Sequence, residues 1–425
     1  ESAIRRCLEW IVRHQDADGA WGGIQPPWIY SLLALHASGY SRSHPVMAAG
    51  LHSLEGYWSC ETVDGRRMTQ ACESPVWDTW LSLLALLDCG VKYEESEVMR
   101  RAVAWALARQ VRVPGDWSIS LPDVEPGGWA FERANDHYPD VDDTAVALIV
   151  LARLRAQGAP IAGLDAAIER AVRWVEAMQC ANGGWAAFDK DNTRQLLTKV
   201  PFCDFGETLD PPSVDVTAHV LEALGELGRD TSDPVVSRAL AYIRREQEPG
   251  GSWFGRWGVN HIYGTGAVLP ALRAVGEDMG ADYVQRAAGW LVDCQQADGG
   301  WGESCASYMD QKAIGAGPVT ASQTAWAVMA LHALGSERFA EAMRRGAGYL
   351  ARTQSGGSWD EPHYTGTGFP GYGSGLRTDI ASPGLAEVLG QDRELQRGFM
   401  IKYGMYCHYF PLMALGRVSA DAATQ

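Results

Sequence analysis

One short pattern recurs six times along the chain, and it restricts the possible folds more than any other feature of the sequence. Each copy has an Arg followed by small or apolar residues, a Gln nine residues after that Arg, and then Gly and Trp. The paired positions are Gln15 with Trp21, Gln110 with Gly115 and Trp117, Gln179 with Trp185, Gln247 with Trp253, Gln295 with Trp301, and Gln354 with Trp359. Internal repetition of this kind is typical of stacked helical units that share one core.

Each copy has the pattern of a helix that ends in Gln and is followed by a Gly-rich turn carrying the Trp. Glycine supplies the positive φ that a helix C-terminus or tight turn needs. A Gln amide can bond the backbone of a neighbouring turn while an indole stacks over it. We therefore predict a structural clamp between successive outer helices rather than a ligand site.

Apolar helical segments alternate with these copies. They span 28–37, 77–87, 144–154, 216–227, 266–275 and 324–334. Several are apolar almost all round, which indicates burial on both sides. Polar outer helices that alternate with apolar inner ones predict an all-α fold, an α/α toroid of two concentric rings. No stretch has a strand-like alternation long enough to compete.

Composition excludes several functions. The net charge of −16 disfavours nucleic acid and recruitment to anionic lipid by charge alone. The nine cysteines are scattered without metal-ligand spacing, which favours reduced thiols in a cytoplasmic protein. No apolar run approaches the roughly 18 residues that span a bilayer. The chain begins at Glu1, inside a helical pattern, so we expect the natural N-terminus to lie further upstream.

Three carboxyl groups crowd the start of one apolar helix, in the stretch Asp140-Val141-Asp142-Asp143. One interpretation is an N-cap with acidic residues in the first turn. The other is chemical: like charges this close raise one another's pKa, so one carboxyl can stay protonated and act as a general acid. The residues around the motif decide between the two.

Aromatic residues gather in the loops that lead into the apolar helices, as in Gly127–Glu132 and Trp253–Gly258. Taken singly, each ring is more often core packing than ligand contact, and a lone His is more often structural. Asp215 and His219 are four residues apart and share one helix face. A dry, ring-walled cavity with one strong acid suits carbocation chemistry, because ring faces attract positive charge. A His that donates to the conjugate base strengthens the acid.

Several motifs together resemble bacterial squalene–hopene cyclases over the whole chain. They are Asp-x-Asp-Asp-Thr-Ala at 140–145, the Gln and Trp repeats, Trp-Phe-Gly-Arg-Trp-Gly-Val-Asn at 253–260, Gly-Thr-Gly-Phe-Pro-Gly at 366–371, and the closing segment 403–417. The resemblance implies an isomerase that cyclises squalene to hopene or hopanol without a metal or organic cofactor. It also implies a monotopic enzyme on the cytoplasmic side of the cell membrane, often a homodimer when full length.

The same resemblance implies roles for particular residues. Asp142 is the proton donor, flanked by Asp140 and Asp143, and His219 assists it. Asp78 and Asp215 form a supporting pair, and Tyr263 helps to return the proton through water. The implied cavity wall consists of Trp77, Phe131, Trp257, Phe369, Phe399, Tyr403 and Tyr406. The remaining implied contacts are Gln25 at the water that ends the reaction, and Pro26, Phe202 and Cys203 at the entrance channel.

In length the chain departs from this family, since the N-terminal portion of the family pattern is missing. We expect residues 1–58 to be the remnant of a truncated second α/α barrel and residues 59–425 to form the complete barrel with the acid motif. Such a remnant exposes apolar surface that another segment should cover. The chain alone is therefore expected to cyclise squalene poorly or not at all.

Other functions remain open at this stage. A class II diterpene cyclase shares the acid motif but needs basic contacts to a diphosphate, for which the loops offer little beyond Arg256. A protein prenyltransferase β-subunit needs zinc held by Asp, Cys and His, and no such trio is evident. A toroid glycosidase needs polar sugar-binding groups. The non-enzymatic alternative is a lipid-binding toroid or an inactive truncated paralogue.

Overall fold

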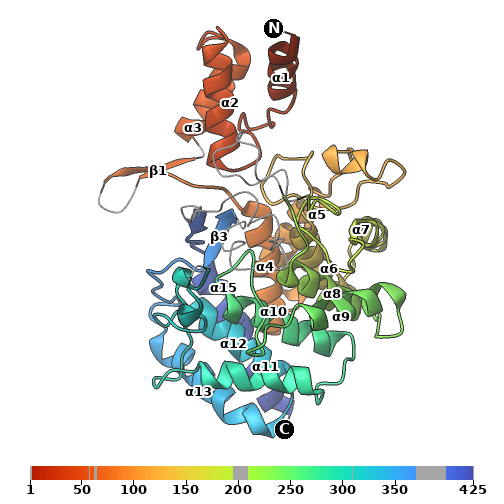
Figure 1. Cartoon of the computed structure of the whole chain (residues 1–425), viewed down its shortest axis with the longest axis vertical. Coiled ribbons are helices and arrows are strands. Elements are labelled where there is room, and N and C mark those ends of the chain that lie inside the picture. Colours follow the sequence, from red (N-terminus) through yellow and green to blue (C-terminus); the bar gives the residue numbers. More distant parts are fainter. Residues whose placement is uncertain are drawn as a thin grey trace, which may run out of the picture.

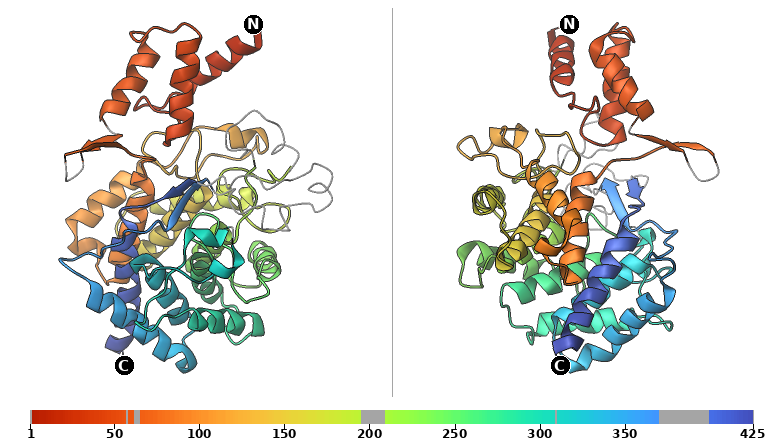
Figure 2. Two further views of the ribbon diagram at one scale, coloured as in Figure 1. Left: turned by 60° about the vertical axis from the view of Figure 1, so that its left-hand side comes forward. Right: turned by 180° about the vertical axis from the view of Figure 1, so that it is seen from behind.

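The inner ring of the fold is built from apolar helices, as their sequences predict. A computed structural model describes residues 2–56, 58–61, 65–194, 209–308, 310–369 and 399–424. Within these residues the inner ring consists of α4 (Pro75–Asp88), α6 (Val141–Ala156), α8 (Val214–Glu226), α10 (His261–Ala274), α12 (Ala321–Ala333) and α15 (Tyr406–Thr424). Each packs against the next, and α15 packs against α4, so the ring is closed (Figures 1 and 2).

Outer helices return the chain between inner ones. They are α5 (Glu97–Leu107), α7 (Leu164–Met178), α9 (Pro234–Arg245), α11 (Asp282–Asp293) and α13 (Glu337–Thr353). In α7 a single stripe that includes Ile168, Ala171 and Val175 is buried, whereas α6 is buried nearly all round. This difference is the one expected between a helix with one solvent face and a helix covered on both sides. The α/α toroid is confirmed.

The Gln–Trp clamp joins successive outer helices. Gln179 donates from its amide to the carbonyls of Gly183 (2.9 Å) and of Val235 (3.0 Å) in the first turn of α9. The indole of Trp185 donates to the carbonyl of Val175 in α7 at 2.7 Å. The same bonds recur around Gln15, Gln247 and Gln295. The predicted structural role of the repeat is confirmed.

The assignment of Gly115 and Trp117 to the second repeat is wrong. Gln110 donates instead to the carbonyl of Gly127 at 2.7 Å, and the indole of Trp129 donates to that of Ala106 at 2.8 Å. The reason is an inserted segment between the Gln and its turn, which contains the 3-10 helix η2 (Asp116–Ile119). That insertion places an unrelated Gly and Trp at nearly the expected spacing.

Three helices lie beside the ring at one end of the molecule (Figure 1). They are α1 (Ser2–Arg13), α2 (Gln25–Ala37) and α3 (Pro45–Gly56), so the apolar segment 28–37 belongs to this group and not to the ring. Their own core contains Trp21, Trp28, Met47 and Trp58. The sixth inner helix is α15, which the apolar segments did not include. Among the described helices, none has the length and apolar character needed to cross a membrane.

Short strands and 3-10 helices complete the described elements. A hairpin of β1 (Ser59–Glu61) and β2 (Arg67–Thr69) follows α3, and β3 (Gly366–Phe369) pairs antiparallel with β4 (Phe399–Ile401) ahead of α15. The 3-10 helices besides η2 are η1 (Tyr93–Glu95), η4 (Cys305–Tyr308) and η5 (Gln311–Ala313). The hairpin projects from the junction between the three-helix group and the ring (Figure 2).

Candidate active site

In three of the repeats the Trp also fixes where the neighbouring inner helix begins. The backbone of Trp129 bridges to Asp140, the residue before α6, and its N–H donates to the hydroxyl of Thr144 in the first turn. Trp185 and Trp301 do the same for α8 and α12. Because each outer helix turns the chain back, the inner helices start at one end of the ring. Side chains of their first turns therefore converge there.

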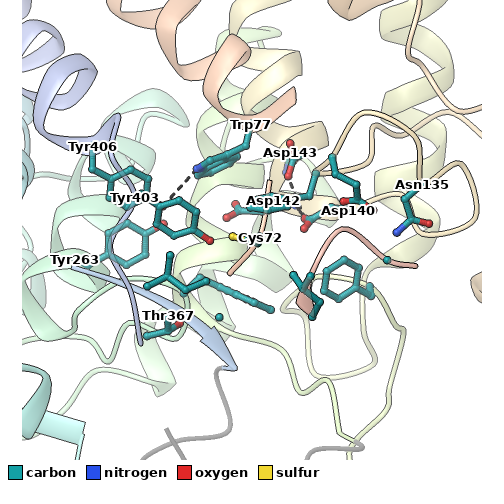
Figure 3. Close-up of a pocket in the computed structure, with 18 residues that line it drawn as sticks. Cys72, Trp77, Asn135, Asp140, Asp142, Asp143, Tyr263, Thr367, Tyr403 and Tyr406 are labelled. Carbon is teal, nitrogen blue, oxygen red and sulfur yellow. Dashed lines mark hydrogen bonds between the residues drawn. The ribbon is translucent and has the colours of Figure 1, made fainter. Parts of the chain in front are cut away.

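A cavity of about 120 Å³ lies at this end of the ring (Figure 3). Nine residues singled out in the sequence line it: Trp77, Phe131, Asp140, Asp142, Asp143, Trp257, Tyr263, Tyr403 and Tyr406. They come from four inner helices and from the loops between, so only the closed ring brings them together. None of the described lining residues is Lys or Arg.

An acid–imidazole pair connects α6 to α8 in the cavity wall. Oδ1 of Asp142 lies 2.5 Å from Nδ1 of His219, and Asp142 is 7% exposed. Burial is the largest single influence on the pKa of His219 and lowers it, but the charge and hydrogen bond of Asp142 together with the charges of Glu222 and Asp215 raise it to about 9. The imidazole is then protonated at neutral pH and donates from Nδ1. Such a donor stabilises the carboxylate left after proton transfer.

The two flanking carboxyls differ from Asp142 in their surroundings. Asp140 is the N-cap of α6, and its Oδ1 accepts from the backbone N–H of Asp142 (2.6 Å) and Asp143 (3.3 Å). Burial and the charge of Asp142 raise the pKa of Asp140 well above its usual value, despite these bonds. Burial and both neighbouring carboxyls raise the pKa of Asp143 in the same direction. The cap and the acid cluster predicted for this stretch are both present.

Asp78 and Asp215 support the site from outside the set of lining residues. Oδ2 of Asp215 accepts from the backbone N–H of Arg256 (3.1 Å) and of Trp257 (2.7 Å), which fixes the loop that carries Trp257. Asp78 accepts from the hydroxyl of Tyr409 at 3.1 Å. Burial raises the pKa of both carboxyls. Asp215 thereby positions part of the cavity wall, and Asp78 joins α4 to α15.

Aromatic rings form one side of the cavity. Tyr403 and Tyr406 stack with ring centroids 4.5 Å apart, and Phe131 meets Tyr403 edge to face at 6.3 Å. The indole of Trp77 donates to the hydroxyl of Tyr406 at 3.3 Å. Figure 3 shows Trp77, Tyr403 and Tyr406 grouped beside Asp142. Ring faces next to an acid suit a site where positive charge develops.

Some residues named in the sequence are not among those lining the cavity. The Gln25 amide donates to the carbonyls of Thr69 (3.3 Å) and Gln70 (2.7 Å) at the end of the hairpin. Pro26 lies in the first turn of α2. Phe369 and Phe399 pair through their backbones in β3 and β4, but their side chains are outside the described part. Phe202 and Cys203 lie outside the described residues altogether.

Other residues that were not assigned to the site from the sequence also line the cavity. They are Gly22, Ile24, Cys72, Glu132, Asn135, Phe188, Thr367, Gly368 and Ile401. Burial, reinforced by the charge of Asp16, raises the pKa of Glu132 to about 8. Glu132 lies within the stretch Gly127–Glu132, and Thr367 and Gly368 lie within the motif at 366–371, so their positions in these motifs were the available signal. In the described residues no group of three or more His, Cys, Asp and Glu is arranged to hold a metal ion.

Solved structures with a similar fold include terpene cyclases. The type II terpene cyclase MstE from Scytonema matches 100% of this chain and 99% of its own, with a TM-score of 0.51 and 17% identity. An ent-copalyl diphosphate synthase from Streptomyces platensis matches 92% of this chain and 57% of its own, with a TM-score of 0.52 and 18% identity. At these identities the likeness concerns the fold alone.

Sequence comparison gives the family. The squalene–hopene cyclase C-terminal domain matches residues 73–374, and the N-terminal domain of the same family matches residues 1–62. The chain is 48% identical to the squalene–hopene cyclase of Alicyclobacillus acidocaldarius subsp. acidocaldarius and 39% identical to that of Bradyrhizobium diazoefficiens. These alignments cover 97% and 98% of this chain. The chain belongs to the squalene–hopene cyclase family, and it spans about 60% of the length of these relatives.

Proposed function

We propose that this chain is the acid-bearing part of a triterpene cyclase that acts on squalene. Asp142 gives its proton to a terminal alkene, and the carbocation that results is attacked by the next double bond in turn. The rings of Trp77, Phe131, Tyr403 and Tyr406 stabilise the successive cations by their negative faces. The last cation loses a proton to water or adds water, which gives hopene or hopanol.

The observation that carries this proposal is the hydrogen bond of 2.5 Å between Asp142 and His219 in the wall of an aromatic cavity. Alkene protonation is the difficult step, because the carbocation that forms is a much stronger acid than the carboxylic acid that donates the proton. Preorganised donors aimed at the conjugate base lower that barrier without reorganisation during the reaction. The protonated imidazole is such a donor, and α6 adds the partial positive charge of its N-terminus.

Two alternative functions, a cyclase that acts on a diphosphate and a non-catalytic lipid-binding protein, are less consistent with the site. A diphosphate substrate requires cationic contacts, and none of the described lining residues is basic. A passive lipid-binding toroid does not require a charged pair, and the burial of charged groups in an apolar cavity is costly. In support of an isoprenoid ligand, the related fold from Scytonema was solved in complex with geranylgeranyl dihydroxybenzoate, at 17% identity and a TM-score of 0.53.

Two further properties of the whole protein are part of this proposal. Squalene is insoluble in water, so the enzyme is proposed to take it up at the surface of the cell membrane, on the cytoplasmic side, without spanning the bilayer. The family resemblance supports this site of action and a homodimeric full-length form. Sedimentation with lipid vesicles and the mass of the full-length protein in solution test these two points.

The decisive experiment is an Asp142→Asn variant in a chain extended by the N-terminal portion of the Alicyclobacillus relative. Loss of a general acid costs about 10²–10⁴-fold in rate, so we expect hopene formation to fall at least about a hundredfold. Asp165→Asn is the matched control, because Asp165 is an exposed first-turn carboxylate of the outer helix α7. Hopene formation that survives Asp142→Asn would remove Asp142 from its role.

A further inference from the structure

One turn of the three-helix group, residues 22–24, forms part of the cavity wall. Gly22 and Ile24 line the cavity, and the turn lies between α1 and α2. Directly after it, the backbone N–H of Gln25 donates at 3.0 Å to the carbonyl of Ala71, in the segment that leads into α4. The turn therefore closes the cavity on the side of the three-helix group, and its displacement would remove that part of the wall.

Two buried carboxyl groups hold this turn from different parts of the molecule. Oδ2 of Asp16, in the three-helix group, accepts from the backbone N–H of Gly22 at 2.7 Å. Glu132, on the loop before α6, packs against Gly23: a Cβ at Gly23 would lie 2.5 Å from Cγ and Cδ of Glu132. Gly23 also has a φ of 64°, which side chains disfavour. One carboxyl of the group and one carboxyl of the ring thus fix the turn.

Glu132 lacks the partners that a buried carboxylate needs. It is 7% exposed and lines the cavity, and its Oε1 has no hydrogen-bond partner in the described structure. Burial first and the charge of Asp16 second raise the pKa of Glu132 to about 8, against a hydrogen bond from Asn135. Burial raises the pKa of Asp16 to about 7. Both carboxyls are therefore neutral in mildly acidic solution, and both are ionised above about pH 8.

The groups around Glu132 do not compensate the charge that it gains on ionisation. The titratable groups that face it from the chain after α1, from the start of α6 and from the segment before α4 are Asp16, Asp140, Asp143 and Cys72. Asp16 in turn faces Asp18 and Asp136. Arg133, the residue after Glu132, forms its ion pair with Glu73 at 3.4 Å. Ionisation of Glu132 therefore adds negative charge to a buried set of acidic groups, which favours separation of the turn from the ring.

We propose that Glu132, as a neutral acid, is a positioning residue that seals the cavity against water by holding residues 22–24 in place, and that its ionisation releases them. Asp16 acts in the same direction, because its charge repels the Glu132 carboxylate. The consequence for catalysis rests on the proposed cyclase function, since water that enters the cavity captures a carbocation before the ring system is complete.

The first test needs no cyclase activity and follows hydrogen–deuterium exchange of the amides of residues 22–25 in the 425-residue chain. After correction for the intrinsic rate, exchange should accelerate at least about tenfold from pH 6 to pH 8.5, because groups whose pKa is raised in the closed state favour opening as pH rises. Glu132→Gln keeps the shape of the neutral acid, so the part of the rise above about pH 7 should disappear. The double variant Asp16→Asn/Glu132→Gln should show no rise.

Two control variants separate this effect from other titrations. Asp165→Asn removes an exposed carboxylate of α7 and should leave the rise unchanged. His137→Gln removes the other titratable contact across the junction, since the rings of His14 and His137 have centroids 5.4 Å apart, and the rise should persist. A rise that survives in the double variant, or one that is lost in His137→Gln, would overturn the proposal whether or not the protein cyclises squalene.

The second test analyses the products of the extended chain over the same pH range. The share of partly cyclised alcohols should grow with the opening of the turn, at least about tenfold from pH 6 to pH 8.5, and it should stay constant in Glu132→Gln. A constant share in the parent chain, despite faster exchange, would contradict the sealing role. If no chain forms hopene, the proposed function fails, while the exchange measurements still decide whether Glu132 holds the turn.

Discussion

Three carboxyls in four residues perform different tasks because their surroundings differ. Asp140 is tied to backbone N–H groups as a helix cap, whereas Asp142 pairs with His219 at 2.5 Å. Asp143 is 1% exposed and leaves Oδ1 without a hydrogen bond in the described structure. A neutral carboxyl in such a place costs less than a carboxylate, which agrees with its raised pKa. The surroundings of each carboxyl group, and not its residue type, therefore distinguish the proposed proton donor Asp142 from Asp140 and Asp143.

At the residue scale, activity is predicted to fall as pH rises through about 9. The pKa of His219 is raised from 6.5 to about 9 in the folded protein, so the imidazole carries a positive charge beside Asp142 below that pH and loses it above. The same raised pKa contributes to stability. That contribution is fully present below the unfolded pKa and is lost as pH rises through about 9.

Turnover and urea unfolding, each measured from pH 6 to pH 10, check this prediction. The extended chain serves for turnover, and the 425-residue chain serves for unfolding. In His219→Gln the step near pH 9 should disappear from the stability curve, and turnover should be low throughout. An alkaline limb that persists in His219→Gln would assign it to another group, of which Glu132 with a pKa of about 8 is the first to examine.

Some of the site could be predicted from sequence and some could not. Asp142, His219 and most of the ring wall are recognisable because they belong to motifs. Cys72 and Ile401 are not, since they reach the cavity from loop and strand segments with no distinguishing pattern. The contact between Asp142 and His219 joins α6 to α8 across 77 positions, and only ring closure fixes it. The roles of Gln25, Pro26, Phe202 and Cys203 stay predictions.

At the scale of the element, Gln179→Ala is predicted to destabilise the protein. The change leaves the buried carbonyl of Gly183 and the partly buried carbonyl of Val235 without their donor, and Arg238 loses an acceptor. Buried groups left unpaired cost about 1–3 kcal/mol each, so we expect the free energy of unfolding to fall by about 2–4 kcal/mol. Urea denaturation followed by far-UV circular dichroism measures the difference.

The chain provides its own control for that prediction. Gln354 holds the same position in the last repeat, but it is exposed and has no side-chain hydrogen bond in the described structure. Surface substitutions of this kind are usually within about 0.5 kcal/mol of neutral, so Gln354→Ala should leave the unfolding curve unchanged. Equal effects of the two substitutions would mean that the Gln contributes through helix propensity and not through the clamp.

The sequence predicts the positions of most inner helices, but it does not predict which helix closes the ring. The inner segments from 77 to 334 were identified because apolar residues surround them on all sides. α15 was not, because Pro411 interrupts its apolar run and a proline inside a helix removes one backbone donor. The structure nevertheless places α15 against α4, where Gly416 allows the close approach: a Cβ there would lie 2.6 Å from the carbonyl oxygen of Asp88. The error at Trp117 has a similar origin, since local spacing cannot reveal an insertion.

At the scale of the molecule, the ring and the three-helix group have separate cores. The group packs around Trp21, Trp28 and Trp58, and the ring packs around its own inner helices. The division at residues 58 and 59 stays a prediction, and the family domains match on either side of residues 63–72. One face of α2 is unusual, because Ile29, Tyr30 and Leu33 are 39–55% exposed. Contiguous apolar exposure of this kind marks a surface that another segment covers.

The 425-residue chain alone is therefore predicted to convert squalene at least about a hundredfold more slowly than the chain extended by the N-terminal portion of a relative. Misplacement of reacting groups by about 1 Å already costs about a hundredfold in rate, and the uncovered face of α2 lies in the group adjoining the cavity, which Gly22 and Ile24 line. Hopene yield measured by gas chromatography at equal protein concentration decides the matter. Leu33→Ser should weaken turnover in the extended chain while leaving the short chain unchanged. Equal hopene yields from the two chains would show that the ring and the three helices already enclose a working site.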